Sequence, residues 1–246
     1  MQIIKVRLPD GRTVSPSDWT SSPLWSSVEI AADANLQPLP AFSYGPGGEV
    51  PGSVGPRQGN EIDTNMQGSG SILAENEELM LFGLQIDLFQ MFSDLDDFFT
   101  GGEAWAPSPP HVSATNCQRV LRSTVVEMRI ATTKAYIQMG LGFFPAAQGV
   151  SMVLGAALNI EAAGADNAPF IGTNGNVSVG SGREFGTPYS VNPGEQFSVT
   201  LKFPFGGVVE PLVAGSAGSL LDFGDDTDAR ILARVYTIGP RRRPVA

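Results

Sequence analysis

Cysteine and histidine are nearly absent from this chain, with one of each among 246 residues. Cys117 has no second cysteine for an intrachain disulfide, and a lone thiol cannot build a cysteine-based metal site. A Ser-His-Asp or Cys-His mechanism would depend on His111 alone, which follows two prolines in an expected loop. Zinc sites with several histidine ligands are excluded as well. We therefore assign no catalytic residue and do not expect an enzyme.

Charged residues are also scarce, at 16% of the chain, against about a quarter in ordinary soluble domains. A surface with little charge and much glycine is often one that neighbouring subunits cover, so the composition hints at assembly. The formal net charge is −10. This acidic balance argues against nonspecific binding of the whole domain to duplex nucleic acid, which needs Lys and Arg to neutralise phosphates.

A run of three arginines, Arg241, Arg242 and Arg243, is a local exception to the acidic balance. Charge runs are usually solvated, so one interpretation is an exposed tail. The other interpretation is a basic contact with nucleic acid, lipid headgroups or an acidic neighbour. The sequence leaves both interpretations open.

Long apolar runs are missing too. The first eight residues have neither the apolar region nor the small-residue cleavage site of a signal peptide. The segment Ala135–Ile160 contains no charged residue, but Pro145, several glycines and polar side chains interrupt it. A spanning helix needs about 20 predominantly apolar residues. Two apolar strands around a Pro-Ala turn fit this segment better than a membrane span.

The clearest element that is present is a strand near residue 200. Phe197, Val199, Leu201 and Phe203 alternate with Ser198, Thr200 and Lys202, which is the period of a strand with one buried face. Asn192-Pro-Gly-Glu195 just before it has the residues of a type II turn. Tyr189–Val191 is the expected partner strand, so the unit is predicted to be a core hairpin.

Similar patterns predict further strands, and glycine and proline together make about a fifth of the chain. The predicted segments are a hairpin of Ile3–Leu8 with Arg12–Val14, then Leu79–Ile86, Gln118–Ile130, Ala135–Phe144, Gly149–Ile160 and Arg230–Ile238. Residues 146–158 fit a small-residue helix as an alternative. About ten short strands with turns between them indicate an all-β antiparallel sandwich or barrel.

The other segments are expected to be helical or irregular. Leu88, Phe92, Leu95 and Phe99 recur at helical spacing and predict one short amphipathic helix insertion. Residues 15–27, with Trp19 and Trp25, and residues 101–116 and 162–186 are expected to be loops. Residues 36–70 lack periodicity, so they are either disordered alone or ordered by contacts elsewhere. We expect a hairpin and arm over 1–70 and the sandwich over 71–246.

Three groups of residues are candidates for chemical sites. Asp222, Asp225, Asp226 and Asp228 place four carboxylates within seven residues, which fits either a solvated acidic turn or a calcium site. Asp94, Asp96, Asp97 and Glu103 suit the wet face of a helix better than the paired carboxylates of a glycosidase. Glycine runs near residues 172–182 do not match phosphate-binding loops and are expected to be turns. No cofactor is predicted, apart from calcium at the acidic loop.

Five segments in order carry a resemblance to a known family. They are Asp63-Thr-Asn-Met66, Val125–Ile130, Phe143-Phe-Pro-Ala-Ala147, Pro188–Leu201 and Ile231–Arg241. Together they resemble jelly-roll capsid proteins of tailless icosahedral bacteriophages, a group that includes tectivirus- and corticovirus-like phages and related single-stranded DNA phages. The likeness covers roughly residues 63–243, and the expected number of strands fits one jelly roll.

The resemblance implies a structural virion protein, made in the host cytoplasm and located in the virion. It implies copies of the chain as partners, in trimers or larger assemblies, together with other virion proteins. Trp19, Trp25, Ser198, Thr200 and Lys202 are then candidates for subunit contacts. Arg241–Arg243 are candidates for contact with the genome or a viral membrane.

Two other functions are left open by the residues. Trp19, Trp25 and Trp105 together with the acidic loop suit a carbohydrate- or surface-binding β-sandwich, such as a spike or lectin-like module, since exposed aromatic rings stack on sugars. A β-sandwich hydrolase built on the carboxylates of residues 94–103 is the third alternative.

Overall fold

The protein is an antiparallel β-sandwich in the computed structural model, and the residues that the structure describes contain almost no helix. The structure describes residues 6–7, 11, 13–14, 19–20, 22–31, 37–53, 56–91, 119–131, 135–144, 151–154, 170–173, 182–204, 208–209, 218–219 and 230–242. The sequence-based prediction of an all-β sandwich is therefore confirmed.

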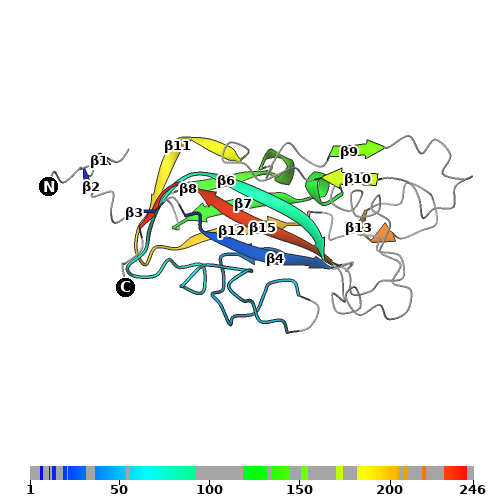
Figure 1. Ribbon diagram of the computed structural model, residues 1–246, viewed down its shortest axis with the longest axis horizontal. Helices are drawn as coiled ribbons and strands as arrows, with labels where there is room; N and C mark the ends of the chain where they lie inside the picture. Colours follow the sequence, from blue (N-terminus) through cyan, green and yellow to red (C-terminus); the bar gives the residue numbers. More distant parts are fainter. Residues whose placement is uncertain are drawn as a thin grey trace, which may run out of the picture.

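The first layer is a six-stranded sheet. Its strands are β3 (Trp19–Thr20), β4 (Trp25–Ala31), β6 (Glu78–Met91), β11 (Arg183–Val191), β15 (Arg230–Ile238) and β16 (Arg241–Arg242). The strand β15 lies between β4 and β6, and β11 pairs with the other side of β6. Beyond these, β16 pairs with both β6 and β3. Figure 1 shows β6, β15 and β4 side by side.

The second layer is a four-stranded sheet. Its strands, in spatial order, are β5 (Leu39–Ala41), β12 (Phe197–Lys202), β7 (Val125–Ile130) and β8 (Ala135–Gly140). A short 3-10 helix, η2 (Leu141–Phe143), follows β8 directly. Because β5 and β4 come before residue 71, both sheets draw strands from each side of the boundary suggested at residue 70.

The core lies between these two sheets. One contiguous cluster of buried apolar side chains contains residues of β4, β6, β11 and β15 from one sheet and of β5, β7 and β12 from the other. Phe197, Val199, Leu201 and Phe203 all belong to it, so the inward face predicted for this strand is confirmed. Phe197 packs against Phe42 with the ring centroids 5.1 Å apart.

The pairing of the eight main strands follows a regular scheme. Numbered in chain order, these strands are β4, β5, β6, β7, β8, β11, β12 and β15. The first pairs with the eighth, the second with the seventh, the third with the sixth, and the fourth with the fifth, always antiparallel. The pairs β4–β15 and β6–β11 belong to the six-stranded sheet. The pairs β5–β12 and β7–β8 belong to the four-stranded sheet.

Three small two-stranded ladders accompany the sandwich. They are β1 (Val6–Arg7) with β2 (Thr13–Val14), β9 (Ser151–Leu154) with β10 (Phe170–Thr173), and β13 (Val208–Val209) with β14 (Gly218–Ser219). The first is the predicted N-terminal hairpin, which is confirmed. Residues 151–154 form a strand, so the helical alternative for this part of 146–158 is wrong.

The turn before β12 is as predicted, but the hairpin is not. Gly194 has a φ of 70°, and the N–H of Glu195 donates to the carbonyl of Asn192 at 3.0 Å, as a type II turn requires. However, β11 pairs with β6 while β12 pairs with β5 and β7. The turn therefore carries the chain from one sheet to the other.

Several predicted boundaries were wrong. Residues 119–123 are helical, and the strand expected from Gln118 begins only at Val125. The helix expected from Leu88 does not begin there, since β6 continues to Met91, and residues 92–99 lie outside the described residues. Residues 25–27, 170–173 and 183–186 are strands where loops were expected. Sheet partners far along the chain stabilise these strands despite weak local patterns.

The two-residue break between β15 and β16 contains a glycine. Gly239 has a φ of 141°, in a region that residues with a side chain rarely adopt. A Cβ atom there would lie 1.8 Å from the carbonyl oxygen of Met80. The adjacent carbonyl of Pro240 accepts a hydrogen bond from the N–H of Met80 at 3.0 Å. The backbone of this break therefore still contacts β6 between the two strands.

Candidate functional site

The outer face of the four-stranded sheet carries a group of polar side chains. Because alternate residues of β7 and β12 enter the core, Glu127 and Arg129 lie on the same outer face as the predicted contact residues. Thr200 is opposite Glu127 and Ser198 is opposite Arg129. Ser198, Thr200 and Lys202 are half-buried. Their predicted place on an outward face agrees with this register, and their role as contact residues stays a prediction.

Glu127 is the centre of this group and is only 6% exposed. Lys202 Nζ donates to its Oε2 at 2.6 Å and Arg129 Nε donates to its Oε1 at 2.9 Å. The hydrogen bond from Lys202 lowers the pKa of Glu127 most, burial opposes it, and bonds from Arg129 and Tyr136 lower it further. The pKa therefore lies below its ordinary value of 4.5, so the carboxylate is ionised at neutral pH.

Tyr136 of β8 extends the group to the edge of the sheet. Its Oη lies 3.1 Å from both Glu127 Oε2 and Gln138 Oε1, and the Arg129 guanidinium lies over its ring, 5.3 Å from the centroid. The ring is 56% exposed, and Phe143, just after β8, is 61% exposed. Exposed aromatic side chains beside hydrogen-bonding groups are typical of protein interfaces. We call Glu127, Arg129, Tyr136, Gln138 and Lys202 the outer-face cluster.

Part of this cluster could be predicted from the sequence. The alternation of Glu127 and Arg129 with Val126, Met128 and Ile130 indicated that the two charged residues share a face. It did not indicate that β12 and β8 flank β7, because strand order depends on distant pairing. Lys202 and Tyr136 could therefore not be joined to Glu127 from the sequence.

The two tryptophans proposed as contact residues lie in the other sheet. Trp19 is in β3 and Trp25 is in β4, and both are half-buried. The backbone N–H of Trp25 donates to Asn65 Oδ1 at 2.8 Å. The structure therefore does not bring these tryptophans together with Ser198, Thr200 and Lys202. Trp105 lies outside the described residues.

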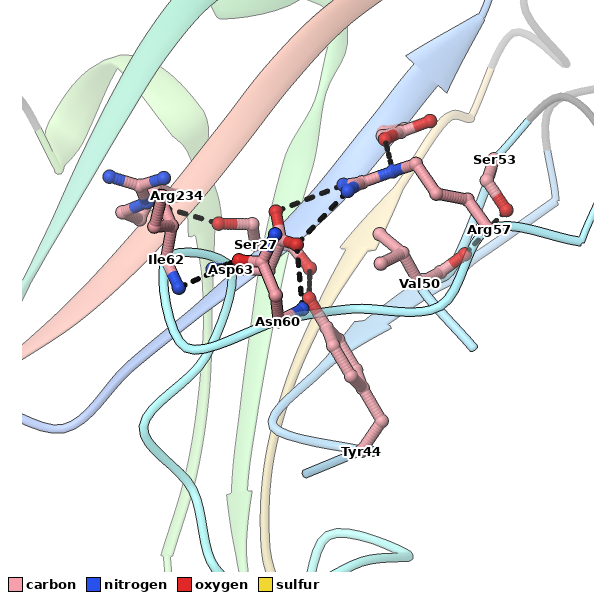
Figure 2. A network of polar contacts seen from close by, with 10 residues as sticks. Ser27, Tyr44, Val50, Ser53, Arg57, Asn60, Ile62, Asp63 and Arg234 are labelled. Carbon is pink, nitrogen blue, oxygen red and sulfur yellow. Dashed lines mark hydrogen bonds and ion pairs between the residues drawn. The ribbon is translucent and has the colours of Figure 1, made fainter. Parts of the chain in front are cut away.

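A second polar network fixes the segment 42–70 to the six-stranded sheet (Figure 2). Arg57 donates two hydrogen bonds to Asp63, at 2.9 and 3.0 Å, and pairs through Nε with the buried Glu29 of β4. Burial alone would raise the pKa of Asp63, but hydrogen bonds from Arg57 and from the N–H of Asn60 outweigh it. The pKa of Asp63 lies below 3.8, which keeps the bridge charged at neutral pH.

The same segment also caps the open edge of β4. Tyr44 Oη donates to the carbonyl of Ser27 at 2.8 Å, and the N–H of Glu29 donates to the carbonyl of Pro51 at 2.9 Å. Burial, and secondly the charge of Asp63, raises the pKa of Tyr44 to about 12. The segment 36–70 was expected to be disordered unless contacts elsewhere ordered it, and in its described part these contacts come from the same chain.

The structure contradicts the contact with nucleic acid or a membrane that was predicted for Arg241. Arg241 is 1% exposed, its Nη2 pairs with Glu77, and the same atom donates to the carbonyl of Asn65 at 3.3 Å. A side chain enclosed in this way cannot reach nucleic acid or a membrane, so the prediction is wrong for Arg241. It was wrong because β16 continues the sheet where a tail was expected. Arg242 is exposed, and Arg243 lies outside the described residues.

The remaining candidate residues are not placed. Asp222, Asp225, Asp226 and Asp228, and likewise Asp94, Asp96, Asp97, Glu103, His111 and Cys117, lie outside the described residues. In the part of the chain that is described, no group of three or more His, Cys, Asp or Glu residues is arranged to hold a metal ion. The described residues also contain no helix with the length and apolarity needed to cross a membrane.

Comparisons with known proteins give no relative. No family model matches the chain, and neither a curated protein nor a solved structure matches it.

Proposed function

We propose that this chain is a structural virion protein: a self-assembling subunit, folded as a single jelly roll, in the capsid of a tailless icosahedral phage. In this proposal the subunit performs no catalysis. Its partners are copies of itself, in trimers or larger assemblies, and other virion proteins. It is made in the host cytoplasm and resides in the virion.

The scheme of strand pairing is the observation that carries the proposal. Pairing of first with eighth, second with seventh, third with sixth and fourth with fifth is the pattern of a long hairpin that is folded over and wrapped into two sheets. This pattern supports the proposal that the sandwich is a jelly roll, an eight-stranded architecture used by viral capsid proteins and by lectin domains. The resemblance of the sequence to phage capsid proteins favours the first of these.

The low charge and the exposed aromatic side chains favour an oligomer over a monomer. Only 16% of the residues are charged, and two of the four large apolar side chains that are exposed among the described residues, Tyr136 and Phe143, lie on or directly after β8. Aromatic residues are enriched at interfaces, whereas charged residues are depleted there. Contact with genome or membrane through Arg242 and Arg243, and calcium at Asp222–Asp228, are secondary parts of the proposal.

The test is the mass and shape of the purified protein. We expect light scattering after size-exclusion chromatography to give a defined oligomer, and negative-stain images to show rings or shells at high protein concentration. The protein should be examined at low and high salt, with and without added calcium. A monomer under all of these conditions would refute the proposal.

A second candidate function is binding of carbohydrate at the outer-face cluster. Tyr136 favours it, because its exposed ring is surrounded by the hydrogen-bonding side chains of Arg129, Gln138 and Glu127. Binding to a glycan array by the wild type, lost in Tyr136→Ala but kept in Phe143→Ala, would support it. Absence of binding with and without calcium would exclude it.

A further inference from the structure

Among the described residues the two sheets of the sandwich have five edge strands, and four of them are protected against pairing with another chain. The strand β3 has only two residues. The edge of β4 is capped by the segment 42–70, as described above. The strand β5 has only three residues, with Pro40 in the middle. The strand β11 contains Pro188 and the exposed charged residues Arg183 and Glu184. Short length, proline, charge and covering segments are the usual means of preventing edge-to-edge pairing.

The strand β8 has none of these protections. Its six residues, Ala-Tyr-Ile-Gln-Met-Gly, include no charged residue and no proline. Within the described ranges, no strand pairs with its outer edge. A six-residue edge of this kind is suited to pairing with another strand.

The backbone groups that β8 presents at this edge can be identified. The N–H of Leu141 donates to the carbonyl of Thr124 at 2.9 Å, in the same register as the ladder between β7 and β8. Hydrogen-bonded pairs alternate along an antiparallel ladder. Ile137 and Met139 therefore bond to β7, whereas the N–H and C=O groups of Tyr136 and Gln138 point away from it.

We propose that β8 pairs in antiparallel orientation with β8 of a second copy of this chain, with Ile137 on the twofold axis. Tyr136 of each copy then lies opposite Gln138 of the other, and these residues exchange backbone hydrogen bonds. The two four-stranded sheets become one continuous eight-stranded sheet. This inference rests on the self-assembly proposed above and names the edge through which it occurs.

Charge complementarity favours this register over the two in which Tyr136 or Gln138 lies on the axis. With Ile137 on the axis, the row that contains Arg129 and Tyr136 continues into the row of the second copy that contains Gln138 and Glu127. Arg129 of one copy and Glu127 of the other then lie in one row, separated by the two β8 strands. An axis at Tyr136 would instead align the two Arg129 rows, and an axis at Gln138 would align the two Glu127 rows. Like charges repel each other, so these two registers are less favourable than the one with Ile137 on the axis.

The apolar side of the strand fits the same arrangement. Ile137 and Met139 are half-buried and pack against the core from the inner face of β8. In the proposed pair, Ile137 of one copy lies beside Ile137 of the other, which extends the apolar layer across the axis. The polar and apolar faces of the two sheets are therefore continuous.

A proline variant tests whether the edge is used. Gln138→Pro removes the outward N–H, and proline is tolerated in an edge strand when its position faces solvent. Gln138→Ala keeps this N–H and serves as the matched control. We expect sedimentation experiments to show that the dissociation constant of the dimer is at least about tenfold higher for Gln138→Pro than for Gln138→Ala. Circular dichroism and thermal unfolding establish that both variants are folded.

Cysteine crosslinking tests the register. In a background of Cys117→Ser, two Ile137→Cys chains would have Cα atoms about 4.5 Å apart across a non-hydrogen-bonded pair, which is within the range for a disulfide. Two Met139→Cys chains would be offset by four residues, about 13 Å along the strand. We expect oxidation to crosslink the first variant at least about tenfold faster than the second.

The outcomes separate this inference from the proposed function. If Gln138→Pro assembles as the wild type does, or if both cysteine variants crosslink equally, the inference about β8 is wrong and self-assembly through another surface stands. If the wild type is a monomer and Ile137→Cys does not crosslink, both proposals are wrong.

Discussion

The buried ion pair between Arg241 and Glu77 gives the most decisive prediction about stability. The two side chains are 1% and 0% exposed, so solvent screens them little and the small energies of surface ion pairs do not apply. Removing one partner of a buried pair typically costs about 3–5 kcal/mol. We therefore expect Arg241→Met to lower the free energy of unfolding by about 3–5 kcal/mol, or the melting temperature by about 6–20 °C for a chain of this length.

Urea unfolding followed by fluorescence would measure this effect, with two comparisons. Arg242→Met changes an exposed arginine in the same strand and should alter the free energy by no more than about 0.5 kcal/mol. The double variant Arg241→Met/Glu77→Leu should recover much of the loss, because two apolar side chains replace both charges. Equal effects of Arg241→Met and Arg242→Met would refute the view that Arg241 is a structural residue.

Three further predictions follow from other parts of the fold. Because the pKa of Glu127 is lowered on folding, its ionised carboxylate should stabilise the protein above pH 4.5, and this contribution should be lost as pH falls from 4.5 through the lower folded pKa. The difference in unfolding free energy between wild type and Glu127→Gln, measured by urea unfolding, should therefore be smaller at pH 3 than at pH 6. An equal difference at the two pH values would contradict this. Gly239→Ala should cost more than about 1 kcal/mol, because its Cβ would lie 1.8 Å from the carbonyl oxygen of Met80, whereas Gly186→Ala, where the space is open, should stay within about 0.5 kcal/mol in thermal unfolding. Phe197→Ala should cost about 3–5 kcal/mol in the same assay, since this ring is fully buried; a smaller loss would mean that the core collapses into the cavity.

The strands with clear alternation were predictable from the sequence. The strand Phe197–Lys202 has a buried and a polar face along its whole length, and its period specifies both faces without any knowledge of its partners. The strand Trp25–Ala31 was missed, because Ser26, Ser27 and Glu29 are buried together with Val28 and Ile30. Its polar residues are covered by the segment 42–70, so local hydrophobicity does not indicate burial there.

Pairing and side-chain contacts were the least predictable features. The residues at 189–191 and 197–202 were expected to pair because they are close in the chain, yet they belong to different sheets. The exposed charge expected for Arg241 illustrates the same limit, since its partner Glu77 is distant in the sequence. Composition and periodicity report on single segments, whereas the outer-face cluster depends on which segments become neighbours.

The position of β15 has a consequence for how the protein is made. This strand lies between β4 and β6, although it leaves the ribosome long after both of them. Leu24 and Thr237 are hydrogen-bonded although they are 213 positions apart. Strands β4 and β6 therefore stay unpaired with each other until β15 has been synthesised. Topologies with such distant contacts fold slowly and are exposed to aggregation meanwhile. Premature termination before residue 230 would remove the centre of a sheet and leave its margins.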